Sequence, residues 1–344
     1  MKILVLGYFG HVTNQLDGQT IKTRDVYSLL EKNSKEQIDC FDTQTFQESK
    51  VNLVKMLTLL IKSDVVFYLP AHNNLKYIFP VIYIVSKLSR TKVNYLVVGG
   101  WLYGFLQSKP IHRYMLARIK GVYTETDSLY SGLQKYNFNN VYKLHNFRLV
   151  RYPTLNLKIT QKETINLVFM ARIHPLKGVD LLFELDKAIK KADIHNASID
   201  IYGPILTSYE DEFFSKIQSS SVRYCGIIEP ANIYAVLQQY DLMLFPTKYY
   251  TEGFPGTILD AYISGIPVIA TNWLNAEEFI DSGETGYIVD FDNDDDFIEK
   301  VVGILKRPQE LYKLKEYVLI KRNKYSSDEA WEVLKRAIYN ESNI

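Results

Sequence analysis

The chain has 344 residues, of which 47% are hydrophobic and 23% are charged. A chain of this length and composition can bury a large apolar core, which excludes a disordered chain, a collagen-like repeat and a coiled-coil rod. Its charges are uneven: residues 1–160 contain 21 basic and 10 acidic residues, a net charge of +11, and residues 161–344 contain 19 and 29, a net charge of −10. The length and the charge asymmetry predict two domains that face different partners.

Short apolar runs alternate with longer amphipathic segments in the first half of the chain. They predict strands at residues 3–6, 65–69, 93–98 and 121–123, and helices at residues 20–30, 75–88 and 111–119 and from Asp127 onward. Uninterrupted apolar strands separated by helices are typical of a parallel sheet that is covered on both faces.

The pattern breaks at a polar, proline-containing connector at residues 151–164 and then restarts. It predicts strands at residues 165–170, 198–203, 242–246, 267–270 and 287–289, helices at residues 179–190, 233–239 and 257–263, and further helices after residue 289 to the end. We expect a domain at residues 1–155, a second at residues 156–320, and a last helix at residues 321–344 that packs back toward the first. Two such α/β units place a ligand crevice between the carboxyl ends of their sheets.

The chain lacks the signals of secretion and of membrane insertion. Its first apolar run, residues 3–6, is followed at once by Gly7 and Gly10, and no run of 18 uncharged apolar residues occurs. We therefore expect a cytoplasmic protein, soluble or peripheral. The two cysteines, Cys40 and Cys225, are too few for a disulfide framework or a four-cysteine zinc site, and we expect both to be buried apolar fillers.

Glycines follow the first predicted strand and precede the first predicted helix. Gly10 allows close approach of backbone to a ligand, and Gly18 lies where free backbone N–H groups of a helix start point outward. An ordinary strand-to-helix turn explains the same residues. The G-x-G-x-x-G fingerprint of nicotinamide-binding proteins is absent.

A basic turn follows the strand predicted at residues 165–170. Arg172 and Lys177 are five residues apart beside a predicted helix start, an arrangement that suits a diphosphate, and His174 lies between them. An exposed basic turn without a ligand is the alternative. The basic turn directly follows a predicted strand, and this position favours anion binding.

The strongest pattern runs from Thr251 to Ala261. Glu252 lies in a loop, Asp260 comes eight residues later, and a glycine-rich turn between them exposes backbone amides from Phe254 through Pro255 and Gly256 to Thr257. If Thr257 opens the helix, Asp260 projects from its first turn. Two carboxylates that flank free amides suit a polyhydroxylated ligand, although Asp260 could instead merely favour the helix dipole.

These residues, together with Gly203, Gly226, Gly265, Gly283 and Glu278, resemble the retaining glycosyltransferases of family 4, which have the GT-B fold and include enzymes of bacterial polysaccharide biosynthesis. The family signature is a glutamate, seven residues and a second glutamate. The resemblance covers most of residues 165–290, and the N-terminal half more loosely. It implies an α/β fold of two Rossmann-like parallel-sheet domains that face each other across a crevice.

The resemblance also implies roles for individual residues. Arg172 and Lys177 would hold the donor diphosphate, Glu252 would bind the transferred sugar, and Asp260 would bind the ribose. The amides between Phe254 and Thr257 would assist at the sugar and the phosphate, and the other implied donor contacts are Gly10, Gly18, Gly203 and Glu278. Such enzymes need no metal or cofactor, because cations and helix dipoles stabilise the leaving group. The acidic run at residues 290–296 accordingly predicts a solvated helix start rather than a metal site.

The sequence departs from the family at three points. The family often has a histidine after the fourth strand, where this chain has Gly99 and Gly100. Its usual Gly-Gly before the later glutamate is Leu274 and Asn275 here, and Asp260 replaces a glutamate, which predicts longer or water-bridged ribose contacts.

Four further positions are possible site residues: His72, Gly100, His145 and His174. His72 ends a predicted strand and could reach the crevice, although a lone histidine there is more often structural. His145 is close to the connector, where it could contact the donor or shape the hinge. His174, beside Arg172, could touch phosphate.

Two amphipathic stretches of the first half are rich in cations. Lysines 50, 55 and 62 surround one apolar stretch, and Lys109, Arg113, Arg118 and Lys120 surround another. Such faces could lie on anionic lipid, or be ordinary helices that pack on the sheet with solvated lysines. Nucleic acid is a poor partner, because no exposed aromatic residues alternate with these cations in a binding-module motif.

The sequence as a whole predicts a retaining, metal-independent glycosyltransferase. We expect it to move a sugar from a UDP- or GDP-linked donor to a glycan, lipid-linked at the inner face of the membrane, in cell-surface polysaccharide synthesis. The alternatives are a sugar-nucleotide epimerase of the same fold and a non-catalytic nucleotide-sugar-binding subunit.

Overall fold

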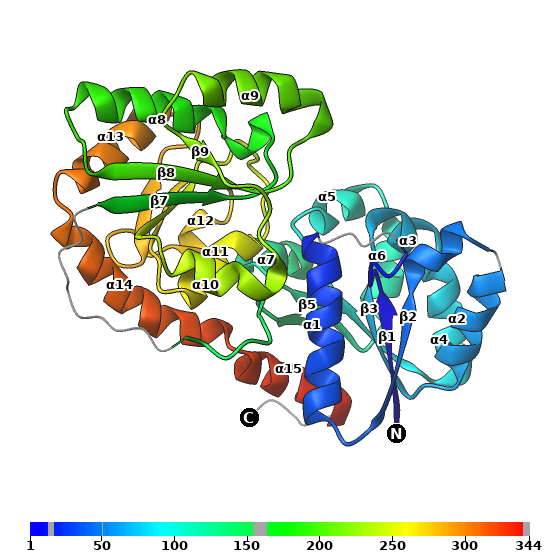
Figure 1. Ribbon diagram of the computed structural model, residues 1–344. Coiled ribbons are helices and arrows are strands. Elements are labelled where there is room, and N and C mark those ends of the chain that lie inside the picture. The colour runs from blue at the N-terminus through cyan, green and yellow to red at the C-terminus, as the bar shows by residue number, and fades with distance from the viewer. Residues whose placement is uncertain (13–16, 50, 154–163, 340–344) are drawn as a thin grey trace. The chain divides into compact units, whose positions relative to one another are not determined.

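The computed structural model describes residues 1–12, 17–49, 51–153 and 164–339, so most of the predicted connector lies outside the described residues. The chain divides into two compact units (Figure 1). The first unit is Met1–Val150 together with Tyr325–Ile344, and the second unit is Arg151–Lys324. Each unit contains one six-stranded parallel sheet.

The sheet of the first unit has the strand order β2-β1-β3-β4-β5-β6. Its strands are β1 (Lys2–Gly7), β2 (Gln37–Asp42), β3 (Val65–Leu69), β4 (Lys92–Leu96), β5 (Gly121–Thr124) and β6 (Val141–Lys143). The register places Ile3 of β1 beside Ile38 of β2 and Val65 of β3. The helices are α1 (Gly18–Asn33), α2 (Val51–Ile61), α3 (His72–Tyr77), α4 (Phe79–Ser89), α5 (Leu102–Gln107), α6 (Pro110–Leu116), α7 (Asp127–Lys135) and α15 (Ser327–Tyr339).

Two buried clusters occupy the two faces of the first sheet. One joins Leu4 and Val66 with side chains of α2, α4 and α6. The other joins Ile3 and Val65 with α1 and with Leu334 of α15, which packs against α1. Because neighbouring residues of a strand point to opposite faces, this division requires central strands that place apolar residues on both of their faces.

One helix predicted at residues 75–88 is two helices, α3 and α4, so that prediction was wrong. Pro80 lies in the first turn of α4. A proline has no backbone N–H and its ring clashes with the preceding turn, so it is tolerated at a helix start but not inside a helix. The chain therefore ends one helix at Tyr77 and begins the next at Phe79.

The second sheet has the strand order β12-β11-β10-β7-β8-β9. Its strands are β7 (Ile165–Met170), β8 (Ala197–Tyr202), β9 (Arg223–Tyr224), β10 (Leu242–Phe245), β11 (Val268–Thr271) and β12 (Gly286–Val289). The helices are α8 (Asp180–Lys191), α9 (Glu210–Gln218), α10 (Ile233–Leu237), α11 (Gly256–Ile263), α12 (Ala276–Phe279), α13 (Asp294–Leu305) and α14 (Gln309–Lys321).

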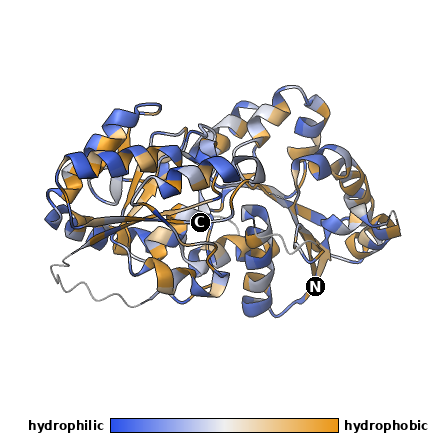
Figure 2. Cartoon of the chain, turned by 45° about the horizontal axis from the view of Figure 1, so that its top comes forward, coloured by the Kyte–Doolittle hydropathy of each residue, from blue (hydrophilic) through white to orange (hydrophobic). Residues whose placement is uncertain are grey.

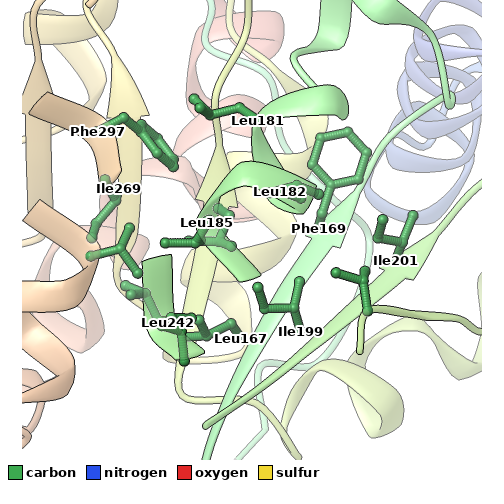
Figure 3. Close-up of a cluster of buried hydrophobic side chains, with 14 of the residues drawn as sticks. Leu167, Phe169, Leu181, Leu182, Leu185, Ile199, Ile201, Leu242, Ile269 and Phe297 are labelled. Carbon is green, nitrogen blue, oxygen red and sulfur yellow. The ribbon is translucent and has the colours of Figure 1, made fainter. Parts of the chain in front are cut away.

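The core of the second unit is built from both its strands and its covering helices. Figure 3 shows Leu167 and Phe169 of β7 and Ile199 of β8 gathered with Leu182 and Leu185 of α8, all buried. Figure 2 shows much of the strand ribbon in the apolar colour, whereas the helices mix polar and apolar segments. This is the expected composition of sheets covered on both faces.

The structure confirms the predicted fold class, an α/β protein with two parallel sheets. The acidic run was predicted to start a helix, and α13 begins at Asp294 with the Asn293 side chain accepting from the Asp296 amide over 3.1 Å. Three acidic residues in that first turn suit the positive end of the helix dipole.

Candidate functional site

Several loops of the second unit meet at the carboxyl edge of its sheet, because all its strands are parallel. Hydrogen bonds join the loops after β7, β8, β9 and β10: Ile173 N to Pro204 O (2.9 Å), Gly203 N to Gly226 O (2.9 Å) and Lys248 N to Leu176 O (2.9 Å). The side chain of Thr257, at the start of α11, donates to the Met170 carbonyl at the end of β7 (2.8 Å). The motifs found in the sequence therefore form one connected edge.

Two glycines allow these loops to approach one another closely. Gly178 has a φ of 75°, and a Cβ there would lie 1.7 Å from the carbonyl oxygen of Pro246, just beyond β10. Gly203 has a φ of 140°, and a Cβ there would lie 1.9 Å from the carbonyl oxygen of Ala171. Only glycine fits either position, so these contacts hold the basic turn against its neighbouring loops.

Lys177 and Glu252 form an ion pair at this edge. Lys177 lies in a short 3-10 helix, Pro175–Lys177, and its side chain is 30% exposed, whereas that of Glu252 is 14% exposed. The Glu252 carbonyl accepts from the Asn275 side chain over 2.6 Å. Arg172 is exposed, and none of the ion pairs found among the described residues includes it. A partly exposed cation beside a carboxylate can hold a phosphate group while the carboxylate accepts from hydroxyls.

The turn before α11 presents a helix N-terminus to the same edge. Pro255 is the N-cap residue and provides no side-chain hydrogen bond to the first amides of the helix. Phe254 is buried, and its ring stacks on Phe279 at a centroid distance of 4.0 Å. This stacking holds the turn before α11 in position. The Gly256 and Thr257 amides lie at the positive end of the helix dipole, where an anion is stabilised.

Asp260 is the fifth residue of α11, so it lies one residue further into the helix than predicted. The helix begins at Gly256 rather than at Thr257. The side chain is buried, and its carboxylate accepts a hydrogen bond from the Tyr234 hydroxyl over 3.1 Å. Tyr234 belongs to α10 and was not identified from the sequence, because one tyrosine in a short helix is not a motif.

The remaining predicted residues of the second unit have local contacts. The Nδ1 atom of His174 accepts from the Leu176 amide over 2.9 Å, so this histidine caps the 3-10 helix and one of its two nitrogens is used there. Glu278 is half-buried in α12, and its amide donates to the Asn275 carbonyl over 3.2 Å. Asn275, one of the departures from the family pattern, is thus the residue that connects α12 to Glu252.

The candidates of the first unit follow strands at the carboxyl edge of the first sheet. Gly10 follows β1, His72 follows β3, Gly100 follows β4 and His145 follows β6. The exposed His72 ring contacts the rings of Trp101 and Phe105, both at 5.1 Å. The His145 ring contacts Tyr325 at 5.4 Å. Gly18 is the first residue of α1, which is capped by the Asp17 side chain.

A buried ion pair at this edge was not predicted from the sequence. Lys22 of α1 and Glu125, which follows β5, are 1% and 4% exposed and contact each other. Lys22 also donates to the Val97 carbonyl over 3.2 Å, and Glu125 accepts from the Gly99 amide over 3.3 Å. The available signal was the helical spacing of Lys22 with Val26 and Leu29, which places the lysine on the buried face of α1.

The two cysteines are exposed, which contradicts the prediction that they fill the core. Cys40 is on β2 and Cys225 follows β9, each at an edge of its sheet. Partial burial is the main cause that raises the pKa of each thiol, and the nearby Asp39 and Asp200 add to the effect at Cys40 and Cys225, respectively. Neither thiol is therefore an activated nucleophile.

Comparisons with known proteins give similarities for the second half of the chain and for the fold. Residues 157–319 match the family model described as "Glycosyl transferases group 1". A protein of Klebsiella pneumoniae, described as an uncharacterized 41.2 kDa protein in the cps region, is 31% identical over 152 residues. That alignment covers 44% of this chain and 40% of the relative, so the chain spans less than half the length of the curated relative.

Several solved structures have the same fold as this chain. Alr3699/HepE of Anabaena, solved with UDP and glucose, has a TM-score of 0.74 and 15% identity and covers 99% of this chain and 100% of its own. The apo lipopolysaccharide outer core galactosyltransferase WaaB has a TM-score of 0.68 and 15% identity, with 99% of each chain covered. Sucrose-phosphate synthase of Thermosynechococcus elongatus has a TM-score of 0.72 and 12% identity, with 99% of this chain and 100% of its own covered.

Proposed function

We propose that the protein transfers a sugar from a nucleotide-diphospho-sugar to a glycan, because the chain has the GT-B fold and residues 157–319 match the group 1 glycosyltransferase family model. The observation that carries the proposal is the grouping of Lys177, Glu252 and the N-terminus of α11 at one edge of the second sheet. The similar Anabaena protein was solved with UDP-glucose, which supports a nucleotide sugar as donor.

Each of these groups has a proposed contact with the donor. Lys177 and Arg172 bind the diphosphate, as do the first amides of α11, and Glu252 binds hydroxyls of the transferred sugar. Asp260, held by Tyr234, binds the ribose hydroxyls. The Lys177–Glu252 ion pair keeps the cation at the junction of sugar and phosphate before the donor arrives. These protein charges stabilise the leaving group without a divalent ion.

We propose that the reaction retains the anomeric configuration of the transferred sugar. The bond between the anomeric carbon and the phosphate oxygen breaks as the acceptor oxygen forms a bond to the same carbon on the same face. The leaving phosphate oxygen takes the proton of the acceptor hydroxyl. Such a front-face reaction depends on stabilising the charge of the leaving diphosphate, which is the role of Lys177 and Arg172, more than on a side-chain base.

The proposed acceptor is a lipid-linked glycan of cell-surface polysaccharide synthesis. The Klebsiella relative lies in a cps region, and WaaB is a lipopolysaccharide galactosyltransferase. Among the described residues, no helix combines the length and the apolar character needed to cross a bilayer. We propose that the protein binds peripherally at the inner face of the cell membrane, where such an acceptor would be presented.

Calorimetric titration of nucleotide sugars and free nucleoside diphosphates tests the donor site. We expect Lys177→Ala to weaken binding of both ligand types by about 10- to 100-fold, because a hydrogen bond to a charged group is lost. Glu252→Ala should weaken binding of the nucleotide sugar alone and leave that of the nucleoside diphosphate unchanged or tighter. Lys187→Ala is the matched control, since this lysine is 70% exposed and pairs with Glu184 on the surface of α8. Wild-type donor affinity in Lys177→Ala would contradict the proposed phosphate contact.

Product analysis separates the proposed transfer from its alternatives. We expect a glycosylated acceptor with the anomeric configuration of the donor. An epimerised nucleotide sugar formed without acceptor would identify an epimerase. Tight donor binding without turnover across a broad panel of glycan acceptors would identify a non-catalytic subunit.

A further inference from the structure

Three helices that cover one face of the first sheet are apolar on their outer sides as well as on their inner sides. Met56 and Leu60 of α2, Phe79 and Ile82 of α4, and Met115 and Leu116 of α6 are buried in the core. We use the name three-helix surface for the exposed side chains of α2, α4 and α6 together with Tyr77 of α3. Its large apolar members are Val51, Val54, Ile61, Tyr77, Val81, Ile84, Leu88, Ile111 and Tyr114.

The exposure of these side chains is high and follows the helix repeat. Leu88 is 81% exposed, Val51 is 72% exposed and Ile111 is 69% exposed. Val81, Ile84 and Leu88 are spaced by three and four residues, so they form one outward stripe along α4. A helix that faces water normally carries polar residues on its outer side. Each of these helices therefore presents a second apolar side that the first unit itself does not cover.

The stripes belong to neighbouring helices. Helix α2 packs beside α4, and α4 packs beside both α3 and α6. The Lys87 ammonium of α4 donates to the Arg118 carbonyl just beyond α6 over 2.7 Å, and a ring nitrogen of His112 in α6 lies 3.2 Å from the Lys76 carbonyl of α3. Figure 1 shows α2 and α4 next to each other at the outer side of the first unit. The exposed apolar side chains therefore lie on neighbouring helices that cover the same face of the first sheet, rather than being scattered singly over the surface.

The charge around this area is almost entirely positive. Residues 51–120 contain ten lysines and arginines and one acidic residue, Asp64. The Asp64 carboxylate accepts from the amide of Lys2, the first residue of β1, over 2.7 Å. Two aromatic side chains of the surface lie beneath cations: the Arg118 guanidinium is 3.6 Å from the Tyr114 ring centroid, and the Lys76 ammonium is 4.7 Å from that of Tyr77. The exposed cations are Lys55, Lys62, Lys87, Arg90, Arg118 and Lys120.

We infer that the three-helix surface docks on an anionic lipid bilayer. The inference rests on the proposed function, to which it adds the docking surface and the class of lipid. A bilayer takes up apolar side chains at the acyl boundary and contacts the flanking lysines and arginines through lipid phosphates. A second copy of the chain fits less well, because a two-fold contact would place this cationic surface against itself. Amphipathic aromatic residues and long basic side chains are suited to such a boundary.

Flotation of the full chain with lipid vesicles tests this inference. We expect binding to vesicles of phosphatidylcholine with phosphatidylglycerol, weaker binding to phosphatidylcholine alone, and weaker binding at high salt. The triple variant Lys55→Gln, Lys62→Gln and Lys120→Gln should bind about 100-fold more weakly, at about fivefold per cation. Its matched control, Lys187→Gln, Lys306→Gln and Lys313→Gln, removes the same charge from exposed lysines of the second unit and should bind as the wild type does.

A second pair of variants tests the apolar contribution. Leu88→Asp should lose at least tenfold in vesicle affinity, whereas Ile320→Asp, at a position 71% exposed on α14, should change it little. Both positions are exposed, so neither change disturbs the core. Absence of vesicle binding, or equal binding by Leu88→Asp and the wild type, would overturn the inference. So would a concentration-dependent dimer that Leu88→Asp abolishes, because the surface would then be an interface between copies.

The outcomes separate this inference from the donor proposal. Nucleotide-sugar titrations of the same surface variants should match those of the wild type, because no altered residue belongs to the second unit's donor site. Vesicle binding without any donor binding would reject the proposed function and leave the docking surface standing. Donor binding without vesicle binding would reject the docking surface and the peripheral membrane binding, and would leave the proposed sugar transfer standing.

Discussion

Lys22 and Glu125 form an ion pair inside the first unit, and its removal has a calculable effect on folding. Both residues are almost fully buried, and the pair is completed by the Val97 carbonyl and the Gly99 amide. Loss of one partner leaves a buried charge without its counter-charge, which costs about 3–5 kcal/mol. Lys22→Met and Glu125→Gln should each destabilise the first unit by that amount, or by roughly 10 °C in its unfolding midpoint.

The double variant Lys22→Met/Glu125→Gln should be less destabilised than the sum of its single variants. It contains no buried charge, and the amide oxygen of a glutamine can still accept from the Gly99 amide. The remaining loss is about 1–3 kcal/mol, because the Val97 carbonyl loses its lysine donor. Equilibrium unfolding in urea, arranged as a double-mutant cycle, measures the coupling between the two positions.

An exposed ion pair of the same unit provides the control for this cycle. Lys143 and Asp127 lie 2.7 Å apart, with side chains 26% and 73% exposed. Removal of that pair should cost less than about 1 kcal/mol. The reasoning would be refuted if the Lys22 and Glu125 single variants lost no more than this control, or if their effects were additive in the double variant.

Two further properties follow from the structure. Gly178→Ala should destabilise the second unit by about 2–4 kcal/mol in urea unfolding and weaken donor binding, because the new methyl group meets the Pro246 carbonyl at a left-handed backbone position. Gly226→Ala, where φ is 79° and nothing lies within 4 Å, should cost only about 1 kcal/mol, and equal losses in the two variants would exclude the close contact as the cause. The thiols of Cys40 and Cys225 have raised pKa values, so their alkylation by iodoacetamide should reach its half-maximal rate above the pH found for free cysteine. Single Cys→Ser variants assign each rate, and a half-maximal rate at or below the pH of free cysteine would contradict this expectation.

The strands at the centre of both sheets were predictable from the sequence, and those at the edges mostly were not. Strands β3 and β10 are continuous apolar runs, and β1, β4 and β7 are mostly apolar, because both faces of these strands are covered. Strands β2, β6 and β9 were missed, and each lies at an edge of its sheet. An edge strand is shorter or more exposed, and β2 contains Asp39 and Cys40, so it shows no continuous apolar pattern.

The candidate donor site also has some features that the sequence predicted and others that only the tertiary structure shows. The sequence alone determined which residues follow the strands of the second sheet, because turns with Arg172, Gly178 and Glu252 are local patterns of a few residues. Tertiary structure alone decided that Lys177 pairs with Glu252, that Tyr234 reaches Asp260 and that Asn275 contacts the Glu252 carbonyl.

The buried ion pair of the first unit shows why some contacts could not be predicted from the sequence. Lys22 and Glu125 are separated by 103 positions, and neither residue differs in its local sequence from a solvated lysine or glutamate. Helix and strand periodicity depends on neighbours within a few residues, so the sequence alone determined the elements and their order. Burial of a charge depends on which distant element supplies its partner, and only the folded first unit decided that.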